Sequence, residues 1–469
     1  MIPLLLLIIL LPFISILPII FVEKQFLKTI QIFVSIIVFV LSILLLLSMS
    51  YSQNIFSLST NFTYLGFNLG FTVTPITIIL ELMTSIVFLA ASLGLGYFIK
   101  ENERLYAILF ALIQGASLAL FLSSSLLLLY IFWEIAEFSM FFIIYLFGSS
   151  NKRYASIKFI VYSIISSLFL LIAILFLYSS ITPNTFTISS IISNAATIPL
   201  NMQLYILIFF ALSFLIKIPI FPFHTWLPDA HTEAPTTGSM VLAGVLLKFG
   251  GYGLILMSLM LPLFKTFSIY FATLFAISAI YSVLVAIKQS NLKRTIAYSS
   301  ITDMAIISIG IASGLSIGTT GALFGMLAHA ISISMLFLLA GTLKEAYGTL
   351  DIAGLKGLAK DLVALPYLFI SGVFATVGIP LTIGFIADVL IFTSAYTTFG
   401  ILGLVPLIGI VLLGGLFFWI IERIFYTGKS KQINYIAKSV IYSEIFLLGT
   451  TVFFGIFSSI LIITPLLVH

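Results

Sequence analysis

Long apolar runs alternate with short polar segments along almost the whole chain. Most runs have about 20 residues, the length that an α-helix needs to cross a lipid bilayer. The sequence lacks the series of roughly ten-residue segments with alternating polarity that is typical of a transmembrane β-barrel. We therefore predict an all-α polytopic membrane protein with about fourteen transmembrane helices. The predicted spans are 2–21, 29–49, 77–99, 105–123, 125–147, 157–178, 202–223, 236–262, 267–287, 295–314, 316–341, 363–395, 402–425 and 438–467.

The basic residues support this helix count. All but three of the 20 lysines and arginines follow odd-numbered predicted helices, and the exceptions are Lys217, Lys248 and Lys265. Basic loops stay in the cytoplasm, so we expect both termini to lie outside a prokaryotic plasma membrane. The polar segments 50–76 and 179–201, which contain no charged residue, are predicted to be folded loops outside the membrane.

Composition limits the chemistry that the chain itself performs. Only 7% of its 469 residues are charged, compared with about 25% in a typical soluble domain. The chain has no cysteine, which excludes disulfides and Cys-ligated zinc or iron–sulfur centres. No G-x-x-x-x-G-K-[ST] loop for ATP is present. We expect no cofactor in this chain, and any electron-transfer centre must belong to another subunit.

Two of the predicted helices contain breaks. Pro219 and Pro222 interrupt the seventh helix, and Gly378 and Pro380 interrupt the twelfth. Because these helices are five apart, they run in opposite directions, as in transporters that contain inverted repeats. The predicted organisation is an N-terminal region (1–104), two inverted five-helix repeats formed by helices 4–8 (105–262) and helices 9–13 (267–425), and a C-terminal helix (426–469).

Several ionisable side chains fall inside predicted helices, where each costs about 2.5–3.5 kcal/mol. They are Glu81, Glu134, Glu137, Lys217, Lys248, Asp303, His329 and Asp388. We expect Glu134 and Lys217 to pair across helices 5 and 7. Both midplane cations are lysines, which can release a proton when buried, whereas arginine stays protonated. The order along the repeats predicts a proton relay through Glu134, Lys217, Lys248, His329 and Asp388.

Structural interpretations compete with this relay. Glu134 can cap a polar pocket, and His329 can be a hydrogen-bonded core residue. For Glu137 we slightly favour a structural role over sharing a proton with Glu134 or facing a neighbouring subunit. The cluster of His224, Asp229, His231 and Glu233 fits no zinc spacing, so we expect a rigid turn there and no metal site.

The segment "FPFHTWLPDAHTEAPTTGSMVLAGVLLKFGGYGL" (221–254) resembles the signature of the antiporter-like subunits of respiratory complex I. That family also includes Mrp cation/proton antiporter and membrane-bound hydrogenase subunits. Further matching segments are "FWE" (132–134), "NLKRTIAYSSITDM" (291–304) and "LFGMLAHAISISMLFLLAGTL" (323–343). The carboxylate at Asp388 and the short C-terminal end are similar to the M-type chains of the family.

The resemblance implies a proton-translocating membrane subunit of an NADH/quinone oxidoreductase, with Glu134, Lys217, Lys248, His329 and Asp388 as its functional residues. It implies other membrane subunits as partners, further antiporter-like chains among them, and no nucleic acid. The alternatives are an Mrp-type Na⁺/H⁺ antiporter subunit, a subunit of a hydrogenase or ferredoxin-linked complex, and a structural scaffold. Three positions depart from the family pattern: Asp388 replaces the usual Glu, Asp303 a His or Gln, and Glu137 an apolar residue.

Overall fold

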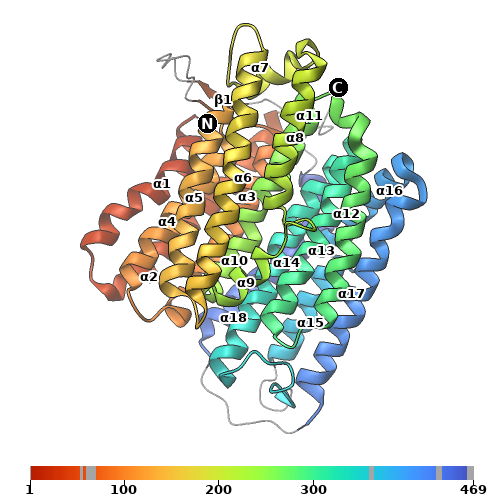
Figure 1. Ribbon diagram of the computed structural model, residues 1–469. Coiled ribbons are helices and arrows are strands. Elements are labelled where there is room, and N and C mark those ends of the chain that lie inside the picture. Colours follow the sequence, from red (N-terminus) through yellow and green to blue (C-terminus); the bar gives the residue numbers. More distant parts are fainter. Residues whose placement is uncertain (1, 53–55, 60–69, 359–363, 429–435, 462–469) are drawn as a thin grey trace.

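The computed structural model describes residues 2–52, 56–59, 70–358, 364–428 and 436–461. Its helices run side by side in one bundle (Figure 1). The first half contains α1 (Ile2–Phe21), α2 (Lys24–Ser52), α3 (Pro75–Phe98), α4 (Glu103–Leu122), α5 (Leu126–Phe147), α6 (Lys152–Ser180), α7 (Ile188–Ser193), α8 (Leu200–Lys217), α9 (Trp226–Glu233), α10 (Thr236–Val241) and α11 (Leu247–Met260). The second half contains α12 (Leu263–Ile287), α13 (Leu292–Ala312), α14 (Ser316–Tyr347), α15 (Ala364–Val377), α16 (Ile383–Phe399), α17 (Val405–Ile421) and α18 (Lys438–Ile456).

Shorter elements connect these helices. Strands β1 (Phe56–Ser59) and β2 (Gly70–Val73) form one antiparallel hairpin, so the described part of the chain is almost entirely helical. The π-turn η2 (Leu242–Leu246) joins α10 to α11. The remaining short turns are η1 (Ala195–Thr197), η4 (Gly400–Leu404), η5 (Glu422–Tyr426) and η6 (Ser458–Leu461).

The predicted number of membrane crossings is confirmed. Thirteen stretches among the described residues are long and apolar enough to cross a bilayer. One of them, Ile383–Tyr426, has 44 residues and would extend about 66 Å as a single helix, twice the hydrocarbon thickness. The chain instead turns at η4, so this stretch belongs to two crossings. The first is begun by α15 and completed by α16, and the second is α17, which gives fourteen crossings among the described residues. Two predicted spans lie partly outside the described residues: residue 363 of the span 363–395, and residues 462–467 of the span 438–467.

Both predicted breaks are present. The seventh crossing stops at Lys217 and resumes as α9 at Trp226, and the twelfth stops at Val377 and resumes as α16 at Ile383. Gly378, at the second break, has a φ of +71°, a conformation that glycine adopts without the steric cost of a side chain. The backbone therefore turns inside the bundle next to Lys217 and next to the helix that contains Asp388.

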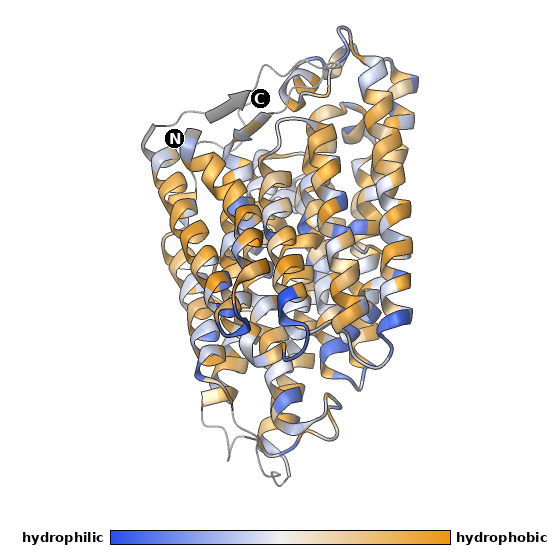
Figure 2. Ribbon diagram, turned by 90° about the vertical axis from the view of Figure 1, so that its left-hand side faces the viewer, coloured by the Kyte–Doolittle hydropathy of each residue, from blue (hydrophilic) through white to orange (hydrophobic). Residues whose placement is uncertain are grey.

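The central crossings are α3, the helix formed by α10, η2 and α11, and α13 and α14, because almost all their side chains are buried. The outer helices expose apolar stripes instead. On α6, Val161, Leu168 and Leu175 are exposed at seven-residue intervals, the spacing of one helix face. Hydrophilic segments gather at the lower end of the bundle in Figure 2, where the basic loops lie. Lys360, Lys429 and Lys431 lie outside the described residues.

Candidate functional site

Lys217, the last residue of α8, is paired with Glu137 of α5. The side chains of Lys217 and Glu137 are only 2% and 1% exposed. Aromatic rings surround the ammonium group, with centroids 5.6–6.0 Å from Nζ, and they belong to Trp133, Phe159, Trp226 and Phe249. The predicted contact between Lys217 and Glu134 is wrong, because Glu137 occupies that position.

The packing of α5 explains the exchange of partners. Trp133, Glu137, Met140 and Ile144 form the buried stripe of this helix, with the spacing of one helix face. Glu134 lies to one side of the stripe and is half-buried beside Tyr130 and Ser167. It still interacts electrostatically with Lys217 and Glu137. Exposed Ile131 and Phe138 flank it along the chain, so Glu134 is at the lateral surface of the bundle.

Lys248 is the centre of a second cluster. It follows the π-turn η2, and its Nζ lies 2.6 Å from the carbonyl oxygen of Ala243 and 2.6 Å from Nδ1 of His329. A π-turn displaces the helix register. The carbonyl oxygen of Ala243 lies inside this turn and accepts a hydrogen bond from the Lys248 ammonium group. Lys248 and His329 are both buried. The interaction joins α11 to α14.

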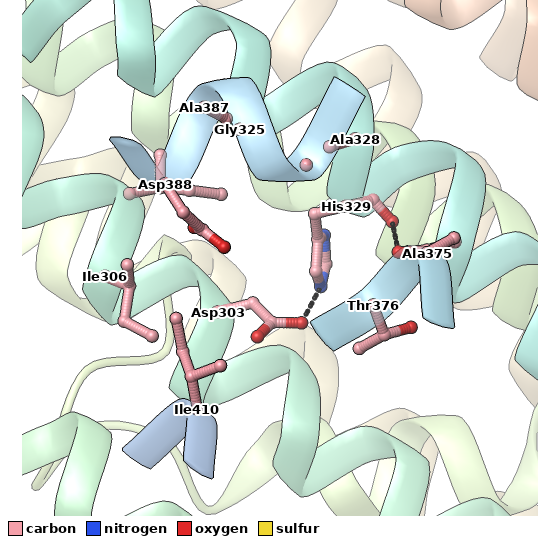
Figure 3. Close-up of a pocket in the computed structure, with 13 residues that line it drawn as sticks. Asp303, Ile306, Gly325, Ala328, His329, Ala375, Thr376, Ala387, Asp388 and Ile410 are labelled. Carbon is pink, nitrogen blue, oxygen red and sulfur yellow. Dashed lines mark hydrogen bonds and ion pairs between the residues drawn. The ribbon is translucent and has the colours of Figure 1, made fainter. Parts of the chain in front are cut away.

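The second cluster continues to two acids. Nε2 of His329 is 3.9 Å from Oδ2 of Asp303 on α13. Figure 3 shows the Asp303 and Asp388 carboxyl groups directed towards one cavity that the His329 ring also lines. This cavity offers about 30 Å³ to the centres of water molecules, more than the 10–15 Å³ that one water requires. Water therefore fits between the two carboxyl groups.

The two clusters meet where α8 contacts α11. A Cβ atom placed on Gly250 would lie 3.1 Å from Cβ of Lys217 and 3.0 Å from the backbone nitrogen of Ile218, which is closer than ordinary van der Waals contact. Glycine thus permits the close approach of the two helices. Among the described residues no hydrogen bond joins Lys217 directly to Lys248. The predicted relay residues Lys217, Lys248, His329 and Asp388 therefore belong to two clusters, which are neighbours at the contact between α8 and α11.

Other predicted polar residues have separate partners. Glu81 accepts a hydrogen bond from Ser42, between α3 and α2. Asp229 pairs with Lys158 at 2.7 Å and with Arg294 at 2.8 Å. The carboxylate of Glu233 accepts the backbone N–H of Asn151 at 2.9 Å. These contacts hold α9 against α6 and α13. The predicted rigid turn is instead a short helix from Trp226 onwards, preceded by a turn that contains His224.

Three features were missed in the sequence. Asp303 was left out of the relay, although it lies next to His329. The π-turn before Lys248 has no sequence signature. Glu444, a buried acid on α18, was not recognised, and neither of its oxygens has a hydrogen-bond partner among the described residues. Its charge inside the apolar run 438–467 was a visible signal.

Comparisons with known proteins agree with the resemblance noted in the sequence. Residues 123–413 match the family described as NADH:quinone oxidoreductase/Mrp antiporter, transmembrane. The chain is 38% identical to NADH-quinone oxidoreductase subunit M of Rickettsia prowazekii over 374 residues, 78% of this chain and 75% of that protein. It is 34% identical to F(420)H(2) dehydrogenase subunit M of Methanosarcina mazei over 371 residues, 76% of this chain and 74% of that protein.

Two solved structures share the fold. A chain of respiratory complex I from Thermus thermophilus has a TM-score of 0.88 at 24% identity, covering 98% of this chain and 97% of that one. A chain of the Mrp complex from Dietzia has a TM-score of 0.87 at 16% identity, and the match covers 99% of this chain and 96% of that one. The family match extends over more than half of the chain and includes every residue of both clusters. The chain is therefore a member of the NADH:quinone oxidoreductase/Mrp antiporter transmembrane family.

Proposed function

We propose that this chain is a proton-translocating, non-redox membrane subunit of a complex I-type NADH/quinone oxidoreductase. The main supporting observation is the series of ionisable groups that point into the bundle from α5, α8, α11, α13, α14 and α16. In chain order these groups are Glu137, Lys217, Lys248, Asp303, His329 and Asp388. A structural scaffold gains nothing from so many buried ionisable groups, because each is costly in a bilayer.

The first cluster is suited to receive a signal. Breaking a buried ion pair costs about 3–5 kcal/mol, because one charge is left without compensation. A charge that approaches Glu134 from the side of the bundle competes with Lys217 for the two acids on α5. In this proposal, electron transfer on other subunits moves such a charge, the Glu137–Lys217 pair separates, and Lys217 releases its proton towards Lys248.

The second cluster is suited to receive that proton and pass it on. Lys248 and the His329 imidazole already share a hydrogen bond, and the imidazole faces Asp303 on its other nitrogen. The cavity between Asp303 and Asp388 has space for water, through which a proton reaches the side of the membrane opposite the basic loops. The chain itself binds no quinone, flavin or nucleotide in this scheme.

The basic loops determine the orientation of the chain in the membrane in this proposal. The basic loops face the cytoplasm of a prokaryotic cell, following the positive-inside rule. An even number of crossings then places the start of α1 and the end of α18 on the outer side. The inverted repeats 105–262 and 267–425 would place their two broken helices in opposite orientations.

The test is to substitute Lys248 in the assembled complex. Lys248→Met removes the ammonium group but retains much of the apolar volume, whereas Lys265→Met changes a basic residue at the opposite membrane surface and serves as the control. We expect K248M to lower the number of protons translocated per electron and K265M to leave it unchanged, with both complexes assembled. A normal ratio in K248M contradicts the proposal. Na⁺-dependent exchange without an electron donor would instead indicate an Mrp-type antiporter.

A further inference from the structure

One buried histidine takes no part in the relay described above. His231 lies on α9, in the lower half of the bundle in Figure 1, and its side chain is 0% exposed. Its ring stacks on Phe337 of α14, with the ring centroids 4.6 Å apart. Neither ring nitrogen has a hydrogen-bond partner among the described residues. Leaving a buried polar group unsatisfied costs about 1–3 kcal/mol, so this arrangement needs an explanation.

The surroundings of His231 favour its neutral form. Its side chain is completely buried, and burial disfavours the charged form of an imidazole, as do nearby ammonium groups such as those of Lys293 and Lys248. A neutral imidazole has one nitrogen that donates and one that accepts a hydrogen bond. It can accept a proton on one side and release one on the other without holding a charge for long.

A water-accessible cavity lies on the basic side of His231. Lys293 lines this cavity together with Ser149, Thr236 and Lys344, and about 120 Å³ is open to water centres, enough for several molecules. A second cavity of about 280 Å³ shares Phe98 and Phe147 with it. Lys293 is only 3% exposed, and its ammonium group donates to the carbonyl of Ala234, three residues after His231. Solvent thus reaches the backbone of the segment that holds His231.

The relay lies on the other side of His231. Phe337 follows His329 by eight residues on α14, which places the His231 ring about 12 Å nearer the basic end than the Lys248–His329 contact. Buried hydroxyl groups occupy the intervening region. Ser239 donates to the carbonyl of His231 at 3.2 Å, and Oγ of Ser334 lies against Gly244 in η2. Each hydroxyl oxygen can also accept a hydrogen bond from a bridging water.

We propose that His231 is the group through which protons enter the relay from the basic side of the membrane. Water in the cavity gives a proton to the free ring nitrogen, and the opposite nitrogen releases its proton towards Lys248, which leaves a neutral ring in its other tautomer. Lys293 repels a second cation while His231 holds the proton. This role rests on the proton translocation proposed above, and it identifies where protons enter the relay.

The experiment compares four single variants in the assembled complex. His231→Phe keeps the aromatic stacking on Phe337 but accepts no proton, and His231→Gln keeps hydrogen bonding but does not titrate. His224→Phe is the matched control, because His224 is another buried histidine among aromatic rings in the same bent segment. Lys248→Met tests the relay itself. Protons translocated per electron are measured in sealed vesicles, with the amount of intact complex determined for each variant.

We expect H231F and H231Q to lower the number of protons translocated per electron to the level of K248M. H224F should keep the wild-type number. If K248M lowers the ratio while both His231 variants pump normally, the entry role is overturned and the relay stands. If K248M also pumps normally, the proposed function fails, and the entry role fails with it. Should H231F not assemble, the smaller H231Q decides the question.

A second measurement tests the cavity independently. Since the chain has no cysteine, Ser149→Cys introduces its only thiol, at the wall of the smaller cavity. A charged thiol reagent added from the basic side is expected to block proton translocation in this variant and not in the complex that contains the unsubstituted chain. Complete labelling with unchanged translocation would overturn the route through this cavity.

Discussion

The contact between Gly250 and the end of α8 gives the most direct test of how packing positions Lys217. In Gly250→Ala the new methyl group would lie 2.7 Å from Cγ1 of Ile218, 3.0 Å from its backbone nitrogen and 3.1 Å from Cβ of Lys217. Ordinary carbon contacts are about 3.5–4.0 Å. The last turn of α8 must therefore move by about 0.4–0.8 Å. The atoms that resist include backbone, so rotation of one side chain cannot relieve the clash.

Two effects follow from this displacement. Overpacking of this kind costs about 1–3 kcal/mol of stability. Lys217 also moves relative to Glu137, and misplacement of a functional group by about 1 Å can lower a rate by about 100-fold. We expect G250A to lower the thermal stability of the purified complex moderately and its proton translocation strongly, measured as the initial rate of vesicle acidification at a matched electron flux.

A matched glycine provides the control. Gly449 is inside α18, and a Cβ added there meets no atom within 4 Å. Gly449→Ala should retain translocation and gain about 0.5–1 kcal/mol, because alanine is the better helix former. If G250A matches wild type in both stability and translocation, the close approach of α8 and α11 does not position Lys217, and the reasoning is refuted.

Two further predictions concern other parts of the fold. Gly378→Ala places a methyl group 2.5 Å from a carboxylate oxygen of Asp388, at a residue whose φ is positive. We therefore expect this variant to lose about 1–2 kcal/mol of stability and to translocate fewer protons. Gly415→Ala is the control, because a Cβ added at Gly415 meets no atom within 4 Å. Asp229→Asn should destabilise the complex by about 1.5–3 kcal/mol, because it weakens the charged contacts with Lys158 and Arg294. The difference in melting temperature between this variant and the wild type should become smaller in high salt. A difference that does not change with salt would contradict an electrostatic cause.

The sequence by itself determined the class of protein, the number of crossings and the positions of both breaks. Hydrophobic length decides whether a segment spans a bilayer, and that property is local to each segment. Pro219, Pro222 and Gly378 likewise act on their own backbone. The expected all-α bundle and the broken helices 7 and 12 were therefore predictable without any knowledge of which helices touch.

Only the tertiary structure decided which acid pairs with Lys217. Glu134 and Glu137 are three residues apart on one helix whose other side chains are nearly all apolar, so hydrophobic periodicity does not distinguish its inner face from its outer one. That choice depends on the helices packed against α5. The π-turn that brings the carbonyl of Ala243 to Lys248 and the burial of His231 against Phe337 also arise from contacts between distant segments. The shape of a packed core is a property of all its helices together.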